Sequence, residues 1–227
     1  MKRALLPSLV VAGLVGASAL AVAHGLADEI VGDINGQLYE LSRNQARTGA
    51  VATAAAVAEL TAEANTAIKL APGNALYWDV LARVDYFPRS TATGAVVTDH
   101  EGAYAAAKAA VVRQPSSAYT WASFAYASDQ LLTRGMLPGG QAALEQALNR
   151  ATTLGGREPH VLRIVVDMGL ANWDTIGAAT RSSVQSAMRN LAVHHPADII
   201  AIAANRGRLA QACETKRLAT QKTCTTL

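Results

Sequence analysis

The sequence predicts an all-α fold, in which paired helices stack as an α-α solenoid behind an N-terminal apolar helix. Alanine, the best helix former because it loses no side-chain entropy, occupies 48 of the 227 positions. Only 5% of the residues are aromatic, and β-branched residues are also too few for an all-β sandwich. A proline followed at fixed distances by bulky and small residues recurs along the chain, which is typical of stacked helical pairs.

The overall composition excludes several classes of protein. Apolar residues make up 51% of the chain, which is too high a share for a disordered protein. Two cysteines cannot form a disulfide-dense scaffold or a cluster of zinc fingers. The net charge is +3, and only eighteen basic residues face seventeen acidic ones once Lys2 and Arg3 are set aside. Because no basic stripe is present, we expect no nucleic-acid partner.

Residues 1–27 are predicted to form a signal peptide or a single membrane anchor. Lys2 and Arg3 precede an uncharged run from Ala4 to Ala23, whose 20 residues would span about 30 Å as a helix. The run ends in Ala21-Val22-Ala23, the small-x-small form that signal peptidase accepts. Both interpretations stay open, beside the simpler alternative of a buried core helix.

Either membrane interpretation predicts the same location for the rest of the chain. Positive charges next to an apolar segment stay on the cytoplasmic side, so the body is expected across the membrane. We therefore expect the protein in the inner membrane, held by its single N-terminal anchor, or in the periplasm. No cysteine lies near the end of the apolar run, so a lipoprotein anchor is not expected.

The segment after the apolar run is predicted to form a leading helix and then the first helix of a repeat domain. Ile30, Ile34 and Leu38 recur at helical spacing and predict a leading helix within 28–49. A helical repeat domain is then expected over 50–209. Its first helix covers 50–70, where alanines recur at nearly every turn.

A recurring pattern of prolines organises this predicted domain. Four prolines precede helical stretches at spacings of 43, 44 and 37 residues: Pro72, Pro115, Pro159 and Pro196. A tryptophan stands six residues after each of the first two, a large apolar residue nine after and an alanine ten after. Val165, Met168 and Gly169 take these positions in the third repeat. The bulky residues share one helical face, and the small residue allows a neighbouring helix to approach closely.

Each of these helices is followed by a second one, except the last. The second helices are expected over 101–114, 141–154 and 178–193, and a last short helix over 197–206. The segment 210–227 contains few apolar residues after Leu218, so we expect a loosely ordered C-terminal tail.

The two cysteines, Cys213 and Cys224, lie 11 positions apart in this tail. In an oxidising compartment they could close a small disulfide loop, which would contribute about 2–3 kcal/mol. The alternative is a pair of unlinked thiols. A catalytic cysteine is not expected, because no C-x-x-C motif is present and no histidine neighbours either residue.

The repeat resembles that of tetratricopeptide-repeat proteins. The segment from Trp78 to Ala82 has the form Trp-x-x-Leu-Ala, and alanines stand five and twelve residues before the closing Pro115. The resemblance covers about residues 50–206 and is degenerate, because the second repeat spans 44 residues and the third lacks the tryptophan. It implies antiparallel helical pairs that bind other proteins.

A narrower resemblance rests on the order of particular segments. Trp121–Tyr126, Leu154–Pro159 and Asp167–Trp173, followed by Arg206–Leu209 with Cys213, resemble the VpsP-type proteins of bacterial exopolysaccharide biosynthesis clusters. This resemblance implies a role in polysaccharide synthesis or export, with the proteins of that machinery as partners. The membrane is a further expected partner if the N-terminal segment is not cleaved. No reaction and no catalytic residues are implied.

The sequence offers little support for enzymatic chemistry. No phosphate-binding loop, nucleophile elbow or zinc-binding helix motif is present. His194 and His195 are adjacent, and adjacent side chains on a helix point about 100° apart, so a shared metal ion is not expected. Asp167 lies in an apolar run and needs a cationic partner, either Arg163 or an arginine of a neighbouring helix. We therefore expect a non-enzymatic protein with no cofactor and no metal.

The best functional candidate in the sequence is a surface. In solenoids of this kind the first helix of each pair lines a concave face that binds an extended partner. The tryptophan register predicts a partner-binding groove that contains Asp79, Arg83, Tyr86, Tyr119, Tyr126, Asp129, Arg163 and Trp173.

Three alternatives to a protein-binding groove stay open. These residues could be ordinary packing and surface residues. The chain could be an enzyme acting on a glycan through Asp167 or Asp174. The groove could also bind carbohydrate through Tyr119, Tyr126 and Trp173.

Overall fold

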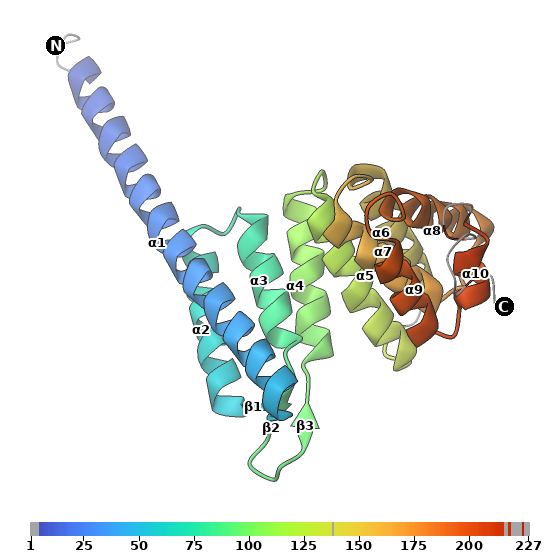
Figure 1. Ribbon diagram of the computed structural model, residues 1–227. Coiled ribbons are helices and arrows are strands. Elements are labelled where there is room, and N and C mark those ends of the chain that lie inside the picture. The colour runs from blue at the N-terminus through green and yellow to red at the C-terminus, as the bar shows by residue number, and fades with distance from the viewer. Residues whose placement is uncertain (1–4, 138, 216–217, 219–223, 225–227) are drawn as a thin grey trace. The chain divides into compact units, whose positions relative to one another are not determined.

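The computed structural model describes residues 5–137, 139–215, 218 and 224, and helices dominate this part of the chain (Figure 1). The all-α prediction is therefore confirmed, since the described strands are only two residues long each. The chain divides into two compact units, Met1–Asp99 and His100–Leu227. The sequence pattern did not predict this boundary, because the proline repeat continues across it.

The first unit contains three helices and three short strands. In chain order they are α1 (Leu5–Thr48), β1 (Ala52–Thr53), α2 (Ala54–Leu70), α3 (Ala75–Asp85), β2 (Arg89–Ser90) and β3 (Val96–Val97). α1 is one continuous helix, so the chain does not break at the predicted boundary between residues 27 and 28. Its second half packs on α2 and α3 through a helical stripe of buried residues: Ala27, Val31, Ile34 and Leu38.

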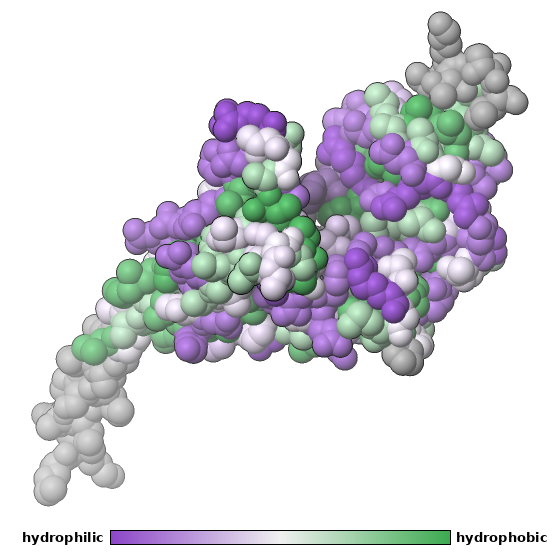
Figure 2. All heavy atoms as spheres, turned by 90° about the horizontal axis from the view of Figure 1, so that it is seen from below, coloured by the Kyte–Doolittle hydropathy of each residue, from purple (hydrophilic) through white to green (hydrophobic). Residues whose placement is uncertain are grey.

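The first half of α1 continues beyond α2 and α3 (Figure 1). Its described side chains are largely apolar and in solvent, as the green and pale atoms next to the grey ones in Figure 2 show, and Val15, Leu20, Val22 and Leu26 are 49–64% exposed. Across the described residues, no helix is long and apolar enough to cross a membrane. The structure describes neither residues 1–4 nor the side chains of residues 5–14, so it covers the segment predicted over 1–27 only in part.

Among the described residues of the second unit, helices are the only regular secondary structure. Its helices are α4 (His100–Arg113), α5 (Ala118–Thr133), α6 (Gly140–Leu154), α7 (Pro159–Ala171), α8 (Ala178–Leu191), α9 (Pro196–Asn205) and α10 (Leu209–Cys213). Each helix from α4 to α10 contacts the next one along the chain. In addition, α7 contacts both α5 and α9, and α6 contacts α8.

The turns that precede α3 and α5 share one construction, which explains the recurring proline and tryptophan. The indole nitrogen of Trp78 donates to the Pro72 carbonyl at 3.1 Å, and that of Trp121 donates to the Pro115 carbonyl at 2.8 Å. The residue two after each proline caps the helix, because its side chain accepts a backbone N–H of the first turn. Trp121 is buried, as expected for a core residue, whereas Trp78 is half-buried.

The third repeat differs from the first two in its register. α7 begins at Pro159 itself, whereas α3 and α5 begin three residues after their prolines. Counted from the start of the helix, the tryptophan position therefore falls on Leu162 rather than on Val165. Gly169 still serves as a close-contact residue, because a Cβ there would overlap with the side chain of Val184 on α8.

The first unit also contains a three-stranded sheet that the sequence did not predict. β1 pairs in parallel with β2, and β2 pairs in antiparallel with β3. The strands have two residues each, so no period-2 pattern could reveal them. The sheet ties the segment before α2 to the hairpin after α3.

The C-terminal segment is more ordered than expected in its described part. α10 packs on α9, and Ala212 and Leu218 are fully buried. A disulfide joins Cys213 to Cys224, the pairing that the sequence had left open. The other residues of the predicted tail, namely 216–217, 219–223 and 225–227, lie outside the described ones.

Removing this disulfide is expected to loosen the C-terminal segment. It closes a loop with a sequence separation of 11, so the double change Cys213→Ser/Cys224→Ser should cost about 2–3 kcal/mol of local stability. Hydrogen exchange of the α10 amides measures this cost. A reductant should produce the same acceleration in the wild-type chain, and exchange rates unchanged by either treatment would contradict the expectation.

A buried carboxyl at the end of α3 predicts a pH dependence for the first unit. Burial raises the pKa of Asp85 to about 6, with Asp99 adding to the shift and Arg89 opposing it. The ordinary pKa is 3.8, so the folded state keeps the proton over this interval. The stabilisation by the protonated form is therefore complete below about pH 4 and is lost as the pH rises through about 6.

Replacing this carboxyl by an amide tests the expectation. Asp85→Asn should raise the stability at pH 7 by roughly 1–2 kcal/mol, allowing for solvent screening. It should also flatten the fall in stability between about pH 4 and pH 6. Urea unfolding across this range measures both effects, and parallel pH profiles for the two proteins would show the expectation to be wrong.

Candidate functional site

The polar side chains of the second unit connect helices that are one repeat apart. Five side-chain contacts join α5, α7 and α9 or the segment just after it, between residues 34–43 positions apart. We call this set the interhelix ladder: Tyr119–Glu158, Asp129–Asn172, Arg163–Asp198, Asp167–Arg206 and Asp174–Arg208. Each contact joins one of these helices, or a residue beside it, to the next helix of the set.

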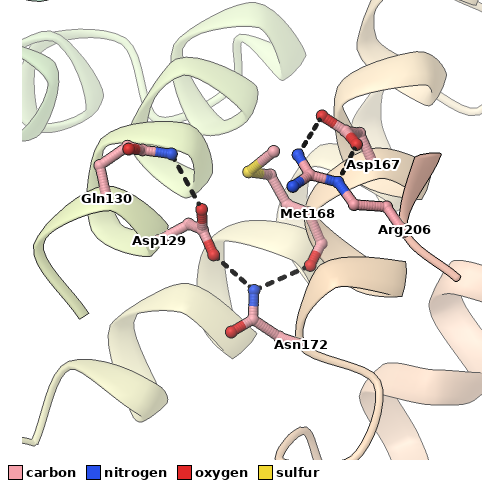
Figure 3. Close-up of polar contacts among 6 residues, drawn as sticks. All are labelled: Asp129, Gln130, Asp167, Met168, Asn172 and Arg206. Atoms are coloured by element: carbon pink, nitrogen blue, oxygen red, sulfur yellow. Dashed lines mark hydrogen bonds and ion pairs between the residues drawn. The ribbon is translucent and has the colours of Figure 1, made fainter. Parts of the chain in front are cut away.

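The buried centre of the ladder is the Asp129 carboxylate on α5 (Figure 3). The Asn172 amide nitrogen donates to Asp129 at 2.5 Å and to the Met168 carbonyl at 3.0 Å. The Gln130 amide donates to the second carboxylate oxygen at 3.2 Å. Burial raises the pKa of Asp129, although the Asn172 hydrogen bond and the charge of Arg206 oppose this. The Asn172 hydrogen bond is the largest of the interactions that compensate this burial.

Two further carboxylates of the ladder are paired with arginines that follow α9. Arg206 donates to both oxygens of Asp167, at 2.7 and 2.9 Å, and this hydrogen bonding raises the pKa of the guanidinium (Figure 3). Arg208 pairs with Asp174 in the same manner. The cationic partner expected for Asp167 is thus an arginine near a neighbouring helix rather than Arg163.

Arg163 lies four residues before Asp167 on α7 and pairs with Asp198 in the first turn of α9. Its Nε donates to Asp198 at 2.6 Å, and its Nη2 lies 3.2 Å from Nδ1 of His195. Both members of the ion pair are 38% exposed, so the pair contributes modestly, about 1 kcal/mol or less. Its main effect is to fix the register of α9 on α7.

The second helices are connected by a separate carboxylate. Glu145 on α6 accepts the Thr180 hydroxyl at 2.7 Å and the Gly177 backbone N–H at 3.1 Å. Burial alone would raise the pKa of Glu145, but these hydrogen bonds and one from Gln141 lower it. Gly177 has no side chain to cap α8, so Glu145 supplies the cap from the neighbouring helix.

The predicted groove residues of the second unit divide into surface and interior. Tyr119 is 48% exposed, while Tyr126 and Arg163 are half-buried. Asp129 and Trp173 are buried, so they contribute to packing rather than to a contact surface. Tyr119, Asp129 and Arg163 all belong to the interhelix ladder.

The other three predicted groove residues belong to the first unit. Asp79 and Arg83 form an ion pair along α3, with 3.4 Å between the carboxylate oxygen and Nε. Tyr86 caps the end of the same helix and is half-buried. They form a local cluster on α3.

Sequence reasoning missed the partners that complete the ladder. Asn172 and Glu145 gave no signal, because a single polar residue in a helical pattern does not reveal its distant partner. The segment Arg206–Leu209 is part of the resemblance to VpsP-type proteins. Its two arginines form ion pairs with Asp167 and Asp174.

Comparison with known proteins does not identify the function of this site. A scan against protein-family models and a search of curated protein sequences each found no match to the chain. The functional argument therefore rests on the fold and on the site itself.

Proposed function

We propose that the chain is a non-enzymatic, periplasm-facing scaffold that supports exopolysaccharide synthesis or export by binding proteins of that machinery. The carrying observation is the layered contact pattern of the second unit. The first helices α5, α7 and α9 contact one another in order, as do the second helices α6 and α8. This is the packing expected of an α-α solenoid of tetratricopeptide-like pairs.

The interhelix ladder supports this arrangement because each of its contacts joins one first helix, or a residue beside it, to the next first helix. Paired carboxylates and arginines hold successive first helices in one register and leave their outer side chains on a common face. A face of this kind is rigid, so little of the binding free energy is lost in ordering its side chains when a partner binds.

The best anchor on this face is Tyr119. Its hydroxyl donates to Glu158 at 3.0 Å, and its ring stacks on His160 at a centroid distance of 6.2 Å. A half-exposed aromatic ring that is already held in place is typical of binding hot spots. Tyr126 and Arg163 are the further candidates for partner contact on α5 and α7.

The N-terminal segment supports the proposed address. The uncharged run from Ala4 to Ala23 follows two basic residues, and the described apolar side chains of this segment lie in solvent. Exposed apolar surface of this length favours insertion into a membrane or removal as a signal peptide. The exopolysaccharide role rests on the resemblance to VpsP-type proteins.

Co-purification from membranes tests the proposal. The tagged wild-type chain should recover proteins of polysaccharide synthesis or export, and Tyr119→Ser should reduce this recovery about tenfold. Tyr39→Ser is a matched control, because Tyr39 is a more exposed tyrosine on α1. Recovery of no envelope or polysaccharide protein, or equal losses in both variants, would contradict the proposal.

A further inference from the structure

A cavity of about 400 Å³ lies between two equivalent turns of successive repeats in the second unit. One turn leads from α6 into α7 and the other from α8 into α9. The Asn190 amide donates to the Gly156 carbonyl at 3.0 Å and so bridges the two turns. The cavity is therefore built by the repeat itself, because it lies where equivalent turns of successive repeats meet.

The ionisable side chains that line this cavity are one arginine and two histidines. Its lining contains Arg157, His194 and His195, and no aspartate or glutamate. Among the described residues, Arg157 has no carboxylate partner. Glu158, next to Arg157, accepts a hydrogen bond from Tyr119. Asp198, three residues after His195, pairs with Arg163 and lies 3.8 Å from Nδ1 of His195. An anion in the cavity would thus meet the guanidinium charge of Arg157 with no described carboxylate paired to it.

The histidines can present donors to such an anion. Nδ1 of His195 accepts from Arg163 at 3.2 Å, which leaves its Nε2 as the protonated ring nitrogen. His194 is exposed at the rim. Arg157 supplies a planar pair of N–H groups, the geometry that binds a carboxylate through both oxygens.

The rest of the lining is apolar. Leu162 and Leu191 are 2% and 1% exposed and belong to the core beneath the cavity. Pro159 and Val193 extend this apolar surface toward the opening. A basic rim over an apolar floor fits a molecule that carries one anionic group on a carbon framework.

We propose that this cavity binds a small organic carboxylate about the size of one six-membered ring. The carboxylate lies against Arg157 and the histidines, and the ring lies over Leu162 and Val193. The volume is at the lower end of the range for small-molecule sites, about 300–1,000 Å³, which suits a single ring. The cavity lining shares no residue with the proposed partner contacts Tyr119, Tyr126 and Arg163, so either proposal can fail without the other.

Calorimetric titration of the full-length chain tests the site. The probes are cyclohexanecarboxylate, D-glucuronate and the neutral cyclohexylmethanol. We expect saturable binding of at least one carboxylate and none of the alcohol. Stronger binding of glucuronate would identify an anionic sugar as the ligand class, and stronger binding of cyclohexanecarboxylate an apolar acid.

Two variants with the same loss of charge separate the site from the general surface. Arg157→Gln should weaken carboxylate binding about tenfold or more, because it removes the charge-assisted hydrogen bonds. Arg150→Gln is the control, since Arg150 is exposed on α6 and does not line the cavity. Absence of saturable carboxylate binding, equal binding of the alcohol, or equal weakening by both variants would overturn the proposal.

Discussion

Asn172→Ala is expected to destabilise the second unit by about 2–4 kcal/mol, because it leaves a buried carboxylate without its principal donor. Asp129 is 3% exposed, and the Asn172 amide lies 2.5 Å from its oxygen. Burial raises the pKa of Asp129, and the Asn172 hydrogen bond is the largest of the interactions that oppose this shift. Urea unfolding of the purified chain at neutral pH measures the loss.

A double-mutant cycle separates this effect from lost packing. Asp129→Ala should also destabilise, since it leaves the amide unpaired, but the double change should cost clearly less than the sum of the two. The expected coupling is about 1–3 kcal/mol. Additive single changes would mean that the pair is no more than two neighbouring polar residues.

The second large effect is expected at the contact between α7 and α8. Gly169→Ala places a Cβ where it overlaps with Val184, so it should destabilise by about 1–3 kcal/mol. The same substitution elsewhere should have the opposite sign. Gly32 on α1 has no atom within 4 Å of such a Cβ, and Gly32→Ala should stabilise by about 0.5–1 kcal/mol through helix propensity.

Restoring space on the facing helix tests the mechanism of this effect. Val184→Ala removes both methyl groups that the new Cβ would meet, so Gly169→Ala should cost little in that background. Thermal unfolding of the four proteins gives the comparison. If Gly169→Ala were equally damaging with and without the valine side chain, close packing would not be its cause.

The helices of this protein could be predicted because their signals are local. The prolines and the alanine-rich faces act within a few residues of the chain. The predicted second helices agree closely with α4, α6 and α8. The register of the third repeat could not be predicted from Pro159. A proline can occupy the first position of a helix as readily as the turn before it.

The contacts that build the candidate site could not be predicted, because they join distant positions. Asp167 required a cation, and sequence reasoning named that requirement correctly. Its partner Arg206 lies 39 residues away and follows α9 rather than lying within it. The cavity at Arg157 was missed for the same reason. Its two turns are 30 or more residues apart, and neither forms a pocket alone.

The tyrosine on the outer face of α5 offers the most direct test of the proposed function. A photo-crosslinking amino acid at position 119, in cells that make the polymer, should capture a discrete envelope protein of polysaccharide synthesis or export. The same probe at position 150, an exposed site on α6, should not capture that protein. A lack of any adduct at position 119, or the same adducts at both positions, would contradict a scaffold that binds through its first helices.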